Sequence, residues 1–149
     1  MNNLLSRLSV GVVAGALSMG AAIAPVYAVE DVLKTPALAT PLASESLLLD
    51  VTKAGDRLVA VGGRGHIIYS DDQGQNWLQA SVPVSGLLTA LSFVDYKNGW
   101  AVGHSGVILH TKDGGESWVK QFDGDQANQM IITQSEARLR KAEGKIESA

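Results

Sequence analysis

The 149-residue chain contains no cysteine, and its aromatic residues make up only 5% of the sequence. The absence of cysteine excludes a disulfide framework, a thiolate metal site and a cysteine nucleophile. Twelve basic and 15 acidic residues give a formal net charge of -3, without a block of like charge. Because nucleic-acid binding needs a basic face that displaces counterions from phosphates, we expect no nucleic-acid partner.

The amino-terminal region has the pattern of an export signal. Arg7 is followed by a run of apolar and small residues from Leu8 to Ala24. Val26-Tyr27-Ala28 then matches the site that signal peptidase reads. The pattern predicts a signal peptide over residues 1–28, cleaved after Ala28, and therefore an exported, periplasmic or lumenal protein. An uncleaved membrane anchor is the alternative, but the apolar run is short for a full span.

An internal repeat occupies the middle of the chain. Residues 57–77 align without a gap with residues 98–118, at an offset of 41 positions. The identical or similar pairs are Ala60 and Ala101, Val61 and Val102, Gly62 and Gly103, Gly65 and Gly106, Ile67 and Ile108, Ser70 and Thr111, Asp72 and Asp113, Gly74 and Gly115, and Trp77 and Trp118. A period near 40 residues, with short apolar runs between Gly, Asp and Asn turns, is typical of a four-stranded β-propeller blade.

The predicted fold is all-β, a partial β-propeller of two four-stranded blades followed by a C-terminal α-helix. The blades are expected at about residues 47–83 and 87–124. Their predicted strands are Leu47–Thr52, Arg57–Val61, His66–Ser70, Trp77–Ala80, Leu87–Phe93, Gly99–Val102, Val107–Thr111 and Trp118–Phe122. Since runs such as residues 58–61 are almost continuously apolar, we expect the central strands to be packed on both faces.

The flanking segments have different compositions. Residues 29–46 contain two prolines and no periodicity, which predicts a linker that leads into the blades. Residues 125–149 are rich in helix formers, and we interpret them as a helix within an insertion between blades. A thin apolar seam along this helix suggests that it needs a partner. The seam consists of Ile132, Ser135, Leu139, Ala142, Ile146 and Ala149.

Both repeats contain the Asp-box motif S/T-x-D-x-G-x-x-W. Its members are Ser70, Asp72, Gly74 and Trp77 in the first repeat, and Thr111, Asp113, Gly115 and Trp118 in the second. The motif suits a tight turn between the third and fourth strands, because the carboxylate accepts backbone N–H bonds and the glycine supplies a positive φ. The Trp ring then fills space against the blade face. We therefore predict a structural role for these eight residues.

Three other features could be mistaken for sites. The acidic stretch at residues 71–76 lacks the closing glutamate of an EF-hand. The glycine-rich turn at residues 62–65 leads into no helix and so lacks the anion-binding helix terminus of a phosphate loop. The three histidines are unrelated by the repeat and have no ligand spacing; they are His66, His104 and His110. We expect no metal, no cofactor and no catalytic residue.

In its two Asp boxes and its Val-Gly-x-x-Gly turns, the chain resembles the photosystem II stability/assembly factor family, which belongs to the BNR/Asp-box repeat propellers. Residues 60–77 and 99–118 look like the blade consensus, and the resemblance covers about residues 47–122. It implies a seven-bladed propeller that binds protein partners and assists membrane-complex assembly in photosynthetic organisms. Relatives also occur in bacteria that do not photosynthesise. The family uses an arginine patch for partner binding, and Arg64 is the counterpart here.

Two blades are too few for a closed propeller ring, which needs about four to eight blades. Each blade buries both faces against neighbours, so two blades leave two apolar faces open, and such faces predict association. We expect the chain to be a truncated portion of a longer reading frame, cut within the helical insertion. A short chain that completes a ring by self-association is the alternative.

Two functions fit these features. The first is a non-catalytic, exported interaction module whose partner is a protein or a membrane protein complex. The second is a sialidase-like glycoside hydrolase fragment, because Asp boxes also occur in sialidases. Glycoside hydrolysis needs an acid/base carboxylate and a nucleophile, with an arginine cluster to bind a sialic acid. The blades offer only Arg57 and Arg64, and Glu116 lies in a turn. The sequence therefore favours the interaction module.

Overall fold

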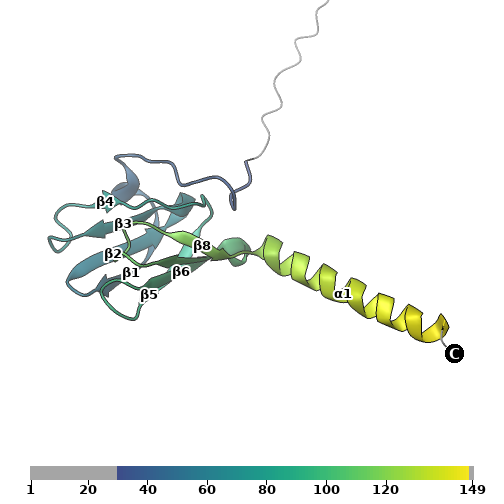
Figure 1. Cartoon of the computed structure of the whole chain (residues 1–149). Coiled ribbons are helices and arrows are strands. Elements are labelled where there is room, and N and C mark those ends of the chain that lie inside the picture. Colours follow the sequence, from purple (N-terminus) through teal and green to yellow (C-terminus); the bar gives the residue numbers. More distant parts are fainter. Residues whose placement is uncertain (1–29, 148–149) are drawn as a thin grey trace, which may run out of the picture.

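The computed structural model describes residues 30–147, so the predicted signal peptide lies outside the described residues. Two four-stranded antiparallel sheets follow one another along the chain and lie side by side, and a long helix leaves the second sheet (Figure 1). This arrangement confirms the predicted fold class, a partial propeller of two blades with a C-terminal helix.

Each sheet places its four strands in chain order. The first sheet, called blade 1 below, consists of β1 (Leu48–Ala54), β2 (Arg57–Gly62), β3 (Ile67–Ser70) and β4 (Leu78–Gln79). The second, called blade 2, consists of β5 (Leu88–Phe93), β6 (Gly99–Gly103), β7 (Ile108–Thr111) and β8 (Val119–Phe122). All eight strands were predicted, with bounds that differ by no more than two residues.

The strand registers reproduce the sequence repeat. Both first hairpins have an irregularity at the same place, between Leu48 and Asp50 in blade 1 and between Leu88 and Ala90 in blade 2. Pairing of Leu48 with Gly62 corresponds to pairing of Leu88 with Gly103. The first strands are therefore equivalent at an offset of 40 and the others at 41. The paired residues Phe93 and Gly99 enclose one residue more than their counterparts, Lys53 and Leu58.

The core lies between the two blades. Its blade 1 side includes Val59, Val61 and Ile67, all fully buried. Its blade 2 side includes Leu88, Leu91, Ala101, Leu109 and Trp118. A smaller buried cluster of Ala43, Ala60 and Ile68 lies on the opposite face of blade 1. The central strands of blade 1 are thus packed on both faces, as predicted. Each large aliphatic side chain contributes about 1.5–3 kcal/mol by its burial.

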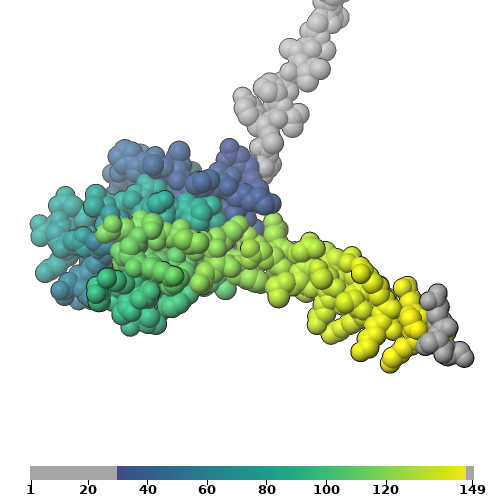
Figure 2. Space-filling view, in the orientation of Figure 1, coloured from purple at the N-terminus to yellow at the C-terminus, as the bar shows by residue number. Residues whose placement is uncertain are grey.

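The segment at residues 30–46 contains no strand, but it is packed against both sheets rather than extending freely. Leu33 joins the core between the blades, and the backbone N–H of Ala37 donates to the carbonyl of Val82 at 3.0 Å. A 3₁₀ turn, η1 (Ala43–Glu45), then places Ala43 on the outer face of blade 1. The blue segment in the space-filling view lies along the sheets accordingly (Figure 2).

Helix α1 (Gly124–Glu147) begins directly after blade 2 and extends away from it (Figure 1). Its 24 residues span about 36 Å at 1.5 Å per residue. The buried Asp123 caps it, because its carboxylate accepts the N–H of Gln126 at 2.9 Å. Apolar side chains such as Met130 and Leu139 remain exposed along the helix. Within residues 30–147, no helix combines the length and the hydrophobicity needed to cross a bilayer.

Candidate functional site

The Asp box of blade 1 closes the turn between β3 and β4 with a local hydrogen-bond network. The Ser70 hydroxyl donates to Asp72 at 2.8 Å and accepts the N–H of Gly74 at 2.8 Å. Asp72 also accepts the backbone N–H of Asn76 at 2.8 Å. The hydrogen bonds that Asn76 donates, first from its backbone N–H and then from its side-chain amide, lower the pKa of Asp72 to about 2. Gly74 has a φ of +90°, which an L side chain rarely adopts.

The box of blade 2 repeats this geometry. The Thr111 hydroxyl donates to Asp113 at 2.7 Å and accepts the N–H of Gly115 at 3.0 Å. Asp113 accepts the N–H groups of Glu116 and Ser117, both at 3.0 Å. Burial opposes ionisation of Asp113, but hydrogen bonds led by Ser117 outweigh it and lower the pKa of this carboxyl. Both box carboxylates are thus ionised acceptors held inside turns.

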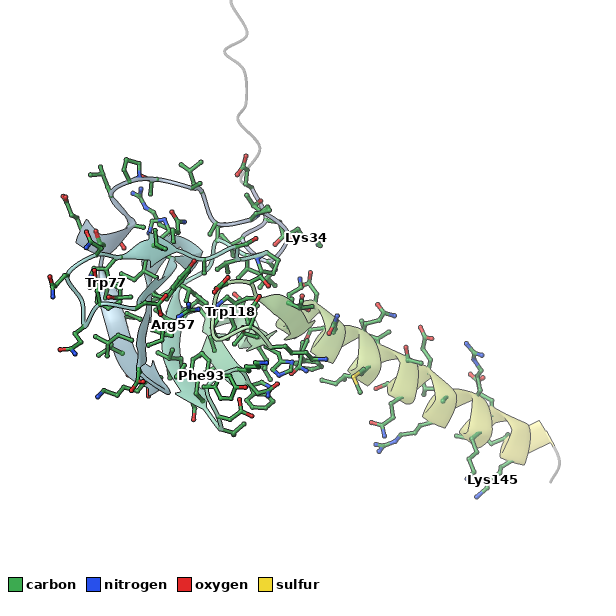
Figure 3. The ribbon with its side chains drawn as sticks, turned by 60° about the vertical axis from the view of Figure 1, so that its left-hand side comes forward. Lys34, Arg57, Trp77, Phe93, Trp118 and Lys145 are labelled. Carbon is green, nitrogen blue, oxygen red and sulfur yellow. The ribbon has the colours of Figure 1, made fainter. Side chains whose placement is uncertain are left out.

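The two Trp rings of the boxes differ in their surroundings. Trp118 is buried between the blades, where its ring meets Phe93 edge to face at 6.0 Å and its Nε1–H donates to the carbonyl of Gly115 at 3.0 Å. Trp77 packs against the smaller cluster on the outer face of blade 1 and is only partly buried. Figure 3 shows Trp77 on the side of the sheets away from α1.

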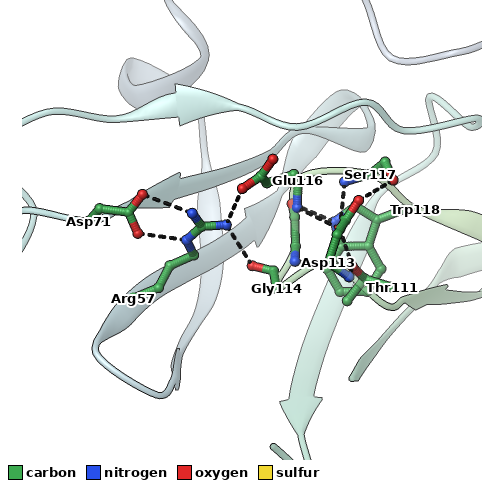
Figure 4. Close-up of polar contacts among 9 residues, drawn as sticks. Arg57, Asp71, Thr111, Asp113, Gly114, Glu116, Ser117 and Trp118 are labelled. Carbon is green, nitrogen blue, oxygen red and sulfur yellow. Dashed lines mark hydrogen bonds and ion pairs between the residues drawn. The ribbon is translucent and has the colours of Figure 1, made fainter. Parts of the chain in front are cut away.

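Arg57 joins the two Asp-box turns across the blade interface (Figure 4). Its Nε and one terminal nitrogen donate to the two carboxylate oxygens of Asp71, at 2.7 and 2.8 Å. The other terminal nitrogen donates to Glu116 at 3.0 Å and to the carbonyl of Gly114 at 3.3 Å, both in blade 2. The guanidinium also lies 4.4 Å from the ring centroid of Tyr69. The hydrogen bonds to Asp71, and to a smaller extent the one to Glu116, raise the pKa of Arg57.

The sequence did not predict this contact. Arg57 corresponds to Asn98 in the second repeat, so the repeat carries no signal for it. Glu116 is 59 positions away along the chain, and only the stacking of the blades brings it close. The one available signal was an acidic residue at a variable position inside each box, Asp71 and Glu116, neither of which is matched in the other repeat.

Arg64, the predicted partner-binding residue, lies at the exposed tip of the turn between β2 and β3. Its backbone has a φ of 57° within the turn η2 (Gly63–Gly65). The structure does not bring Arg64 together with the Asp-box residues through any hydrogen bond or ion pair among the described residues. Its side chain is exposed to solvent.

The three histidines occupy separate environments. His66 is buried, its Nδ1 lies 3.1 Å from the Ser46 hydroxyl, and burial lowers its pKa. His110 stacks on Trp100 with ring centroids 4.6 Å apart. His104 is exposed in the turn after β6. Among residues 30–146, no three side chains of the metal-ligating types gather into a group.

Comparison with known proteins gives one consistent similarity. The family model described as "Photosynthesis system II assembly factor YCF48" matches residues 75–146. The chloroplastic photosystem II stability/assembly factor HCF136 of Arabidopsis thaliana is 26% identical over 144 residues, which cover 87% of this chain. The Guillardia theta HCF136 is 41% identical over 46 residues, or 30% of this chain. The photosystem II assembly protein Ycf48 of Thermosynechococcus vestitus is 33% identical over 42 residues, or 28% of this chain.

The matches extend over a limited part of these longer proteins. The aligned region covers 36% of the Arabidopsis relative and 12% of each of the other two. A solved structure described as "YCF48 bound to D1 peptide" is 28% identical and overlaps 49% of this chain and 24% of that one, with a TM-score of 0.44. The resemblance to the photosystem II stability/assembly factors is confirmed by the sequence matches.

Proposed function

From this similarity to the photosystem II stability/assembly factors, we propose that the chain is part of an exported, non-catalytic β-propeller protein that binds protein partners. The proposed role is to assist assembly of a membrane complex of the photosystem II type, on the periplasmic or lumenal side. The observation that carries the proposal is the family match over residues 75–146, which includes all of blade 2 and all of α1 except its last residue.

The surfaces available for such a partner are polar at one place and apolar at others. Arg64 stands at the tip of the η2 turn and offers a cation to an acidic segment. The outer faces of both blades expose apolar side chains, Val51 in blade 1 and Val102 in blade 2 among them. Exposed apolar surface of this kind supports protein contact, either with a partner or with a second copy of the chain.

The chemistry of the blades does not favour the alternative, a glycoside hydrolase. A general acid in such an enzyme needs a raised pKa. Asp71 hydrogen-bonds to Arg57, which lowers the pKa of this carboxyl, and Glu116 contacts the same guanidinium. Asp72 and Asp113 also have lowered pKa values. Carboxylates bound in this way support a structural role.

Surface plasmon resonance with detergent-solubilised photosystem II complexes tests the proposal. The ligand is the chain without its predicted signal peptide. We expect saturable binding that R64E weakens about tenfold, since charge reversal at a contact costs about 1–2 kcal/mol. The matched control is K141E, a charge reversal on the exposed surface of α1. Absence of binding, equal loss in both variants, or turnover of a fluorogenic sialoside would contradict the proposal.

Export is tested separately by cell fractionation. The periplasmic or lumenal fraction should contain a species whose amino terminus is Val29. An intact amino terminus in the cytoplasmic fraction would contradict the proposed location.

A further inference from the structure

Residues 31–40, called the strap below, cross both blades before the chain enters blade 1. The strap forms backbone hydrogen bonds with the segment that joins the two blades. The N–H of Ala37 donates to the carbonyl of Val82 at 3.0 Å, and the N–H of Ser85 donates to the carbonyl of Val32 at 2.9 Å. The side chain of Leu33 is buried in the core between the blades. The strap therefore docks on the stacked pair of blades rather than on either blade alone.

Two equivalent positions of the repeat hold the strap. Gln79 in β4 and Lys120 in β8 are related by the offset of 41. Gln79 donates from its amide nitrogen to the carbonyl of Leu38 at 3.0 Å, and its amide oxygen accepts the N–H of Thr40 at 2.9 Å. Lys120 donates to the carbonyl of Leu33 at 2.6 Å. The last strand of each blade thus contributes one side chain that binds the backbone of the strap.

Lys120 has a second partner at the start of α1. Its ammonium group lies 2.5 Å from a carboxylate oxygen of Asp123, and the two side chains are 21% and 5% exposed. The other oxygen of Asp123 accepts the N–H of Gln126, and its backbone carbonyl accepts the N–H of Ala127 at 3.1 Å. The hydrogen bond from Lys120, followed by the one from Gln126, lowers the pKa of Asp123. Lys120 therefore joins a carbonyl of the strap to the ionised carboxylate that caps α1.

An exposed ion-pair cluster lies beside this buried contact. Lys34 in the strap lies 2.6 Å from Asp31 and 3.3 Å from Asp125 in α1 (Figure 3). Because all three side chains are largely exposed, solvent screens these pairs and they contribute little. The connection between the strap and α1 consequently depends on Lys120.

We propose that the strap holds α1 in a fixed direction, because docking of the strap and formation of the first turn of α1 are coupled through Lys120. A poorly solvated ammonium group is tolerated only while its hydrogen-bond acceptors remain in place. When the strap lifts, Lys120 loses the carbonyl of Leu33, and the cap at Asp123 loosens. When the first turn opens, the strap loses its hold on blade 2, since coupling between two sites is reciprocal. The inference does not depend on which partner protein binds.

Hydrogen–deuterium exchange in the chain without its predicted signal peptide tests the coupling. A37P removes the N–H that donates to Val82, in a residue that bonds to neither Lys120 nor α1. We expect the N–H groups of Gln126 and Ala127 to exchange about tenfold faster in A37P, within the usual range of coupling between sites. Exchange inside β2 and β6 should not change, which separates strap release from global unfolding.

A variant at Lys120 tests the same coupling from the other side. K120M should accelerate exchange at Ala37 as well as in the first turn of α1, again about tenfold. K120R keeps a charged donor and should restore most of the protection. The matched control is K112M, since Lys112 is an exposed lysine in the same blade and its loss removes the same charge. K112M should exchange like the unmodified chain.

The direction of α1 is measured by double electron–electron resonance. Because the chain contains no cysteine, V94C/A142C places one spin label on blade 2 and one on α1, both at exposed positions. The distance distribution should be narrow in this background. It should broaden when A37P or K120M is added and stay narrow with K112M.

Circular dichroism checks that each variant is folded. If A37P does not fold, Q79L replaces it, because Q79L removes both bonds that Gln79 makes to the strap. Faster exchange in the strap with an unchanged first turn of α1 would overturn the inference. So would faster exchange of the first turn in K120M with an unchanged strap, or a distance distribution that K112M broadens as much as K120M does.

Discussion

Trp77 and Trp118 occupy the same position in successive Asp boxes, yet Trp118 is only 4% exposed, and Trp77 remains partly open to solvent. The difference arises because blade 1 covers the ring of Trp118, whereas no second blade covers Trp77 within the described residues. The two residues therefore provide an internal comparison of what blade stacking contributes.

Replacing the two rings should have unequal effects. W118A removes a buried ring and its hydrogen bond to Gly115, and should lower the free energy of unfolding by about 3–5 kcal/mol. W77A should cost about 1–2 kcal/mol, since less surface is removed from the interior. Urea unfolding followed by circular dichroism measures both, with W118F as a milder variant if W118A does not fold. Equal losses would contradict the stacked arrangement.

Arg57 should stabilise the contact between the blades. R57M keeps part of the apolar stem but removes the bonds to Asp71 and Glu116. Because solvent screens both exposed carboxylates, R57M should lower the free energy of unfolding by only about 0.5–1 kcal/mol. The loss should shrink in 1 M salt, as screening predicts. R64M, at the exposed η2 turn, is the control, and an equal loss in both variants would refute the role of Arg57.

A methyl group at Gly65 should not be tolerated. A Cβ there would lie 2.1 Å from the carbonyl oxygen of Val84, and φ is +72°. We expect G65A to lower the free energy of unfolding by about 2–3 kcal/mol or more, through backbone strain and displacement of the segment at Val84.

At Gly144, in the exposed helix, a Cβ meets nothing within 4 Å. G144A should therefore increase the helical signal at 222 nm, because alanine is favoured over glycine by about 1 kcal/mol. Thermal unfolding of both variants checks the contrast.

Acid should weaken the fold through the Asp boxes. The pKa of Asp72 is lowered to about 2 from 3.8, so folding favours the ionised form. This contribution is complete above about pH 4 and is lost as the pH falls towards 2. The stability difference between pH 5 and pH 2.5, measured by urea unfolding, should be smaller in D72N than in the unmodified chain. An unchanged difference would show that Asp72 does not contribute.

The blades could be predicted because their signals are local. Ser70, Asp72 and Gly74 specify their turn within five positions, and the hydrogen bonds form within that turn. A repeat that includes both the turns and the apolar runs then indicates stacked sheets. The unequal burial of the two Trp rings had no such signal, because it depends on which neighbour is present.

Contacts between distant segments could not be predicted. Leu33 is buried between the blades although residues 29–46 show no periodicity, and Lys120 donates to its carbonyl from 87 positions away. The Arg57 contact with Glu116 likewise exists only after the blades have stacked. Both depend on the tertiary arrangement rather than on local preference.

An engineered disulfide tests most directly whether the two blades stack on each other as described. Within the chain, a carboxylate oxygen of Asp50 in blade 1 lies 2.8 Å from the backbone nitrogen of Leu91 in blade 2. Since the chain has no cysteine, D50C/L91C introduces the only thiols.

Under mild oxidation, D50C/L91C should form a disulfide within one chain, so that the variant migrates faster on a non-reducing gel than after reduction. The single variants D50C and L91C should show no such shift. A shift that depends on both thiols is the result that the stacked blades predict. Free thiols in the oxidised double variant, or disulfides only between different chains, would contradict it.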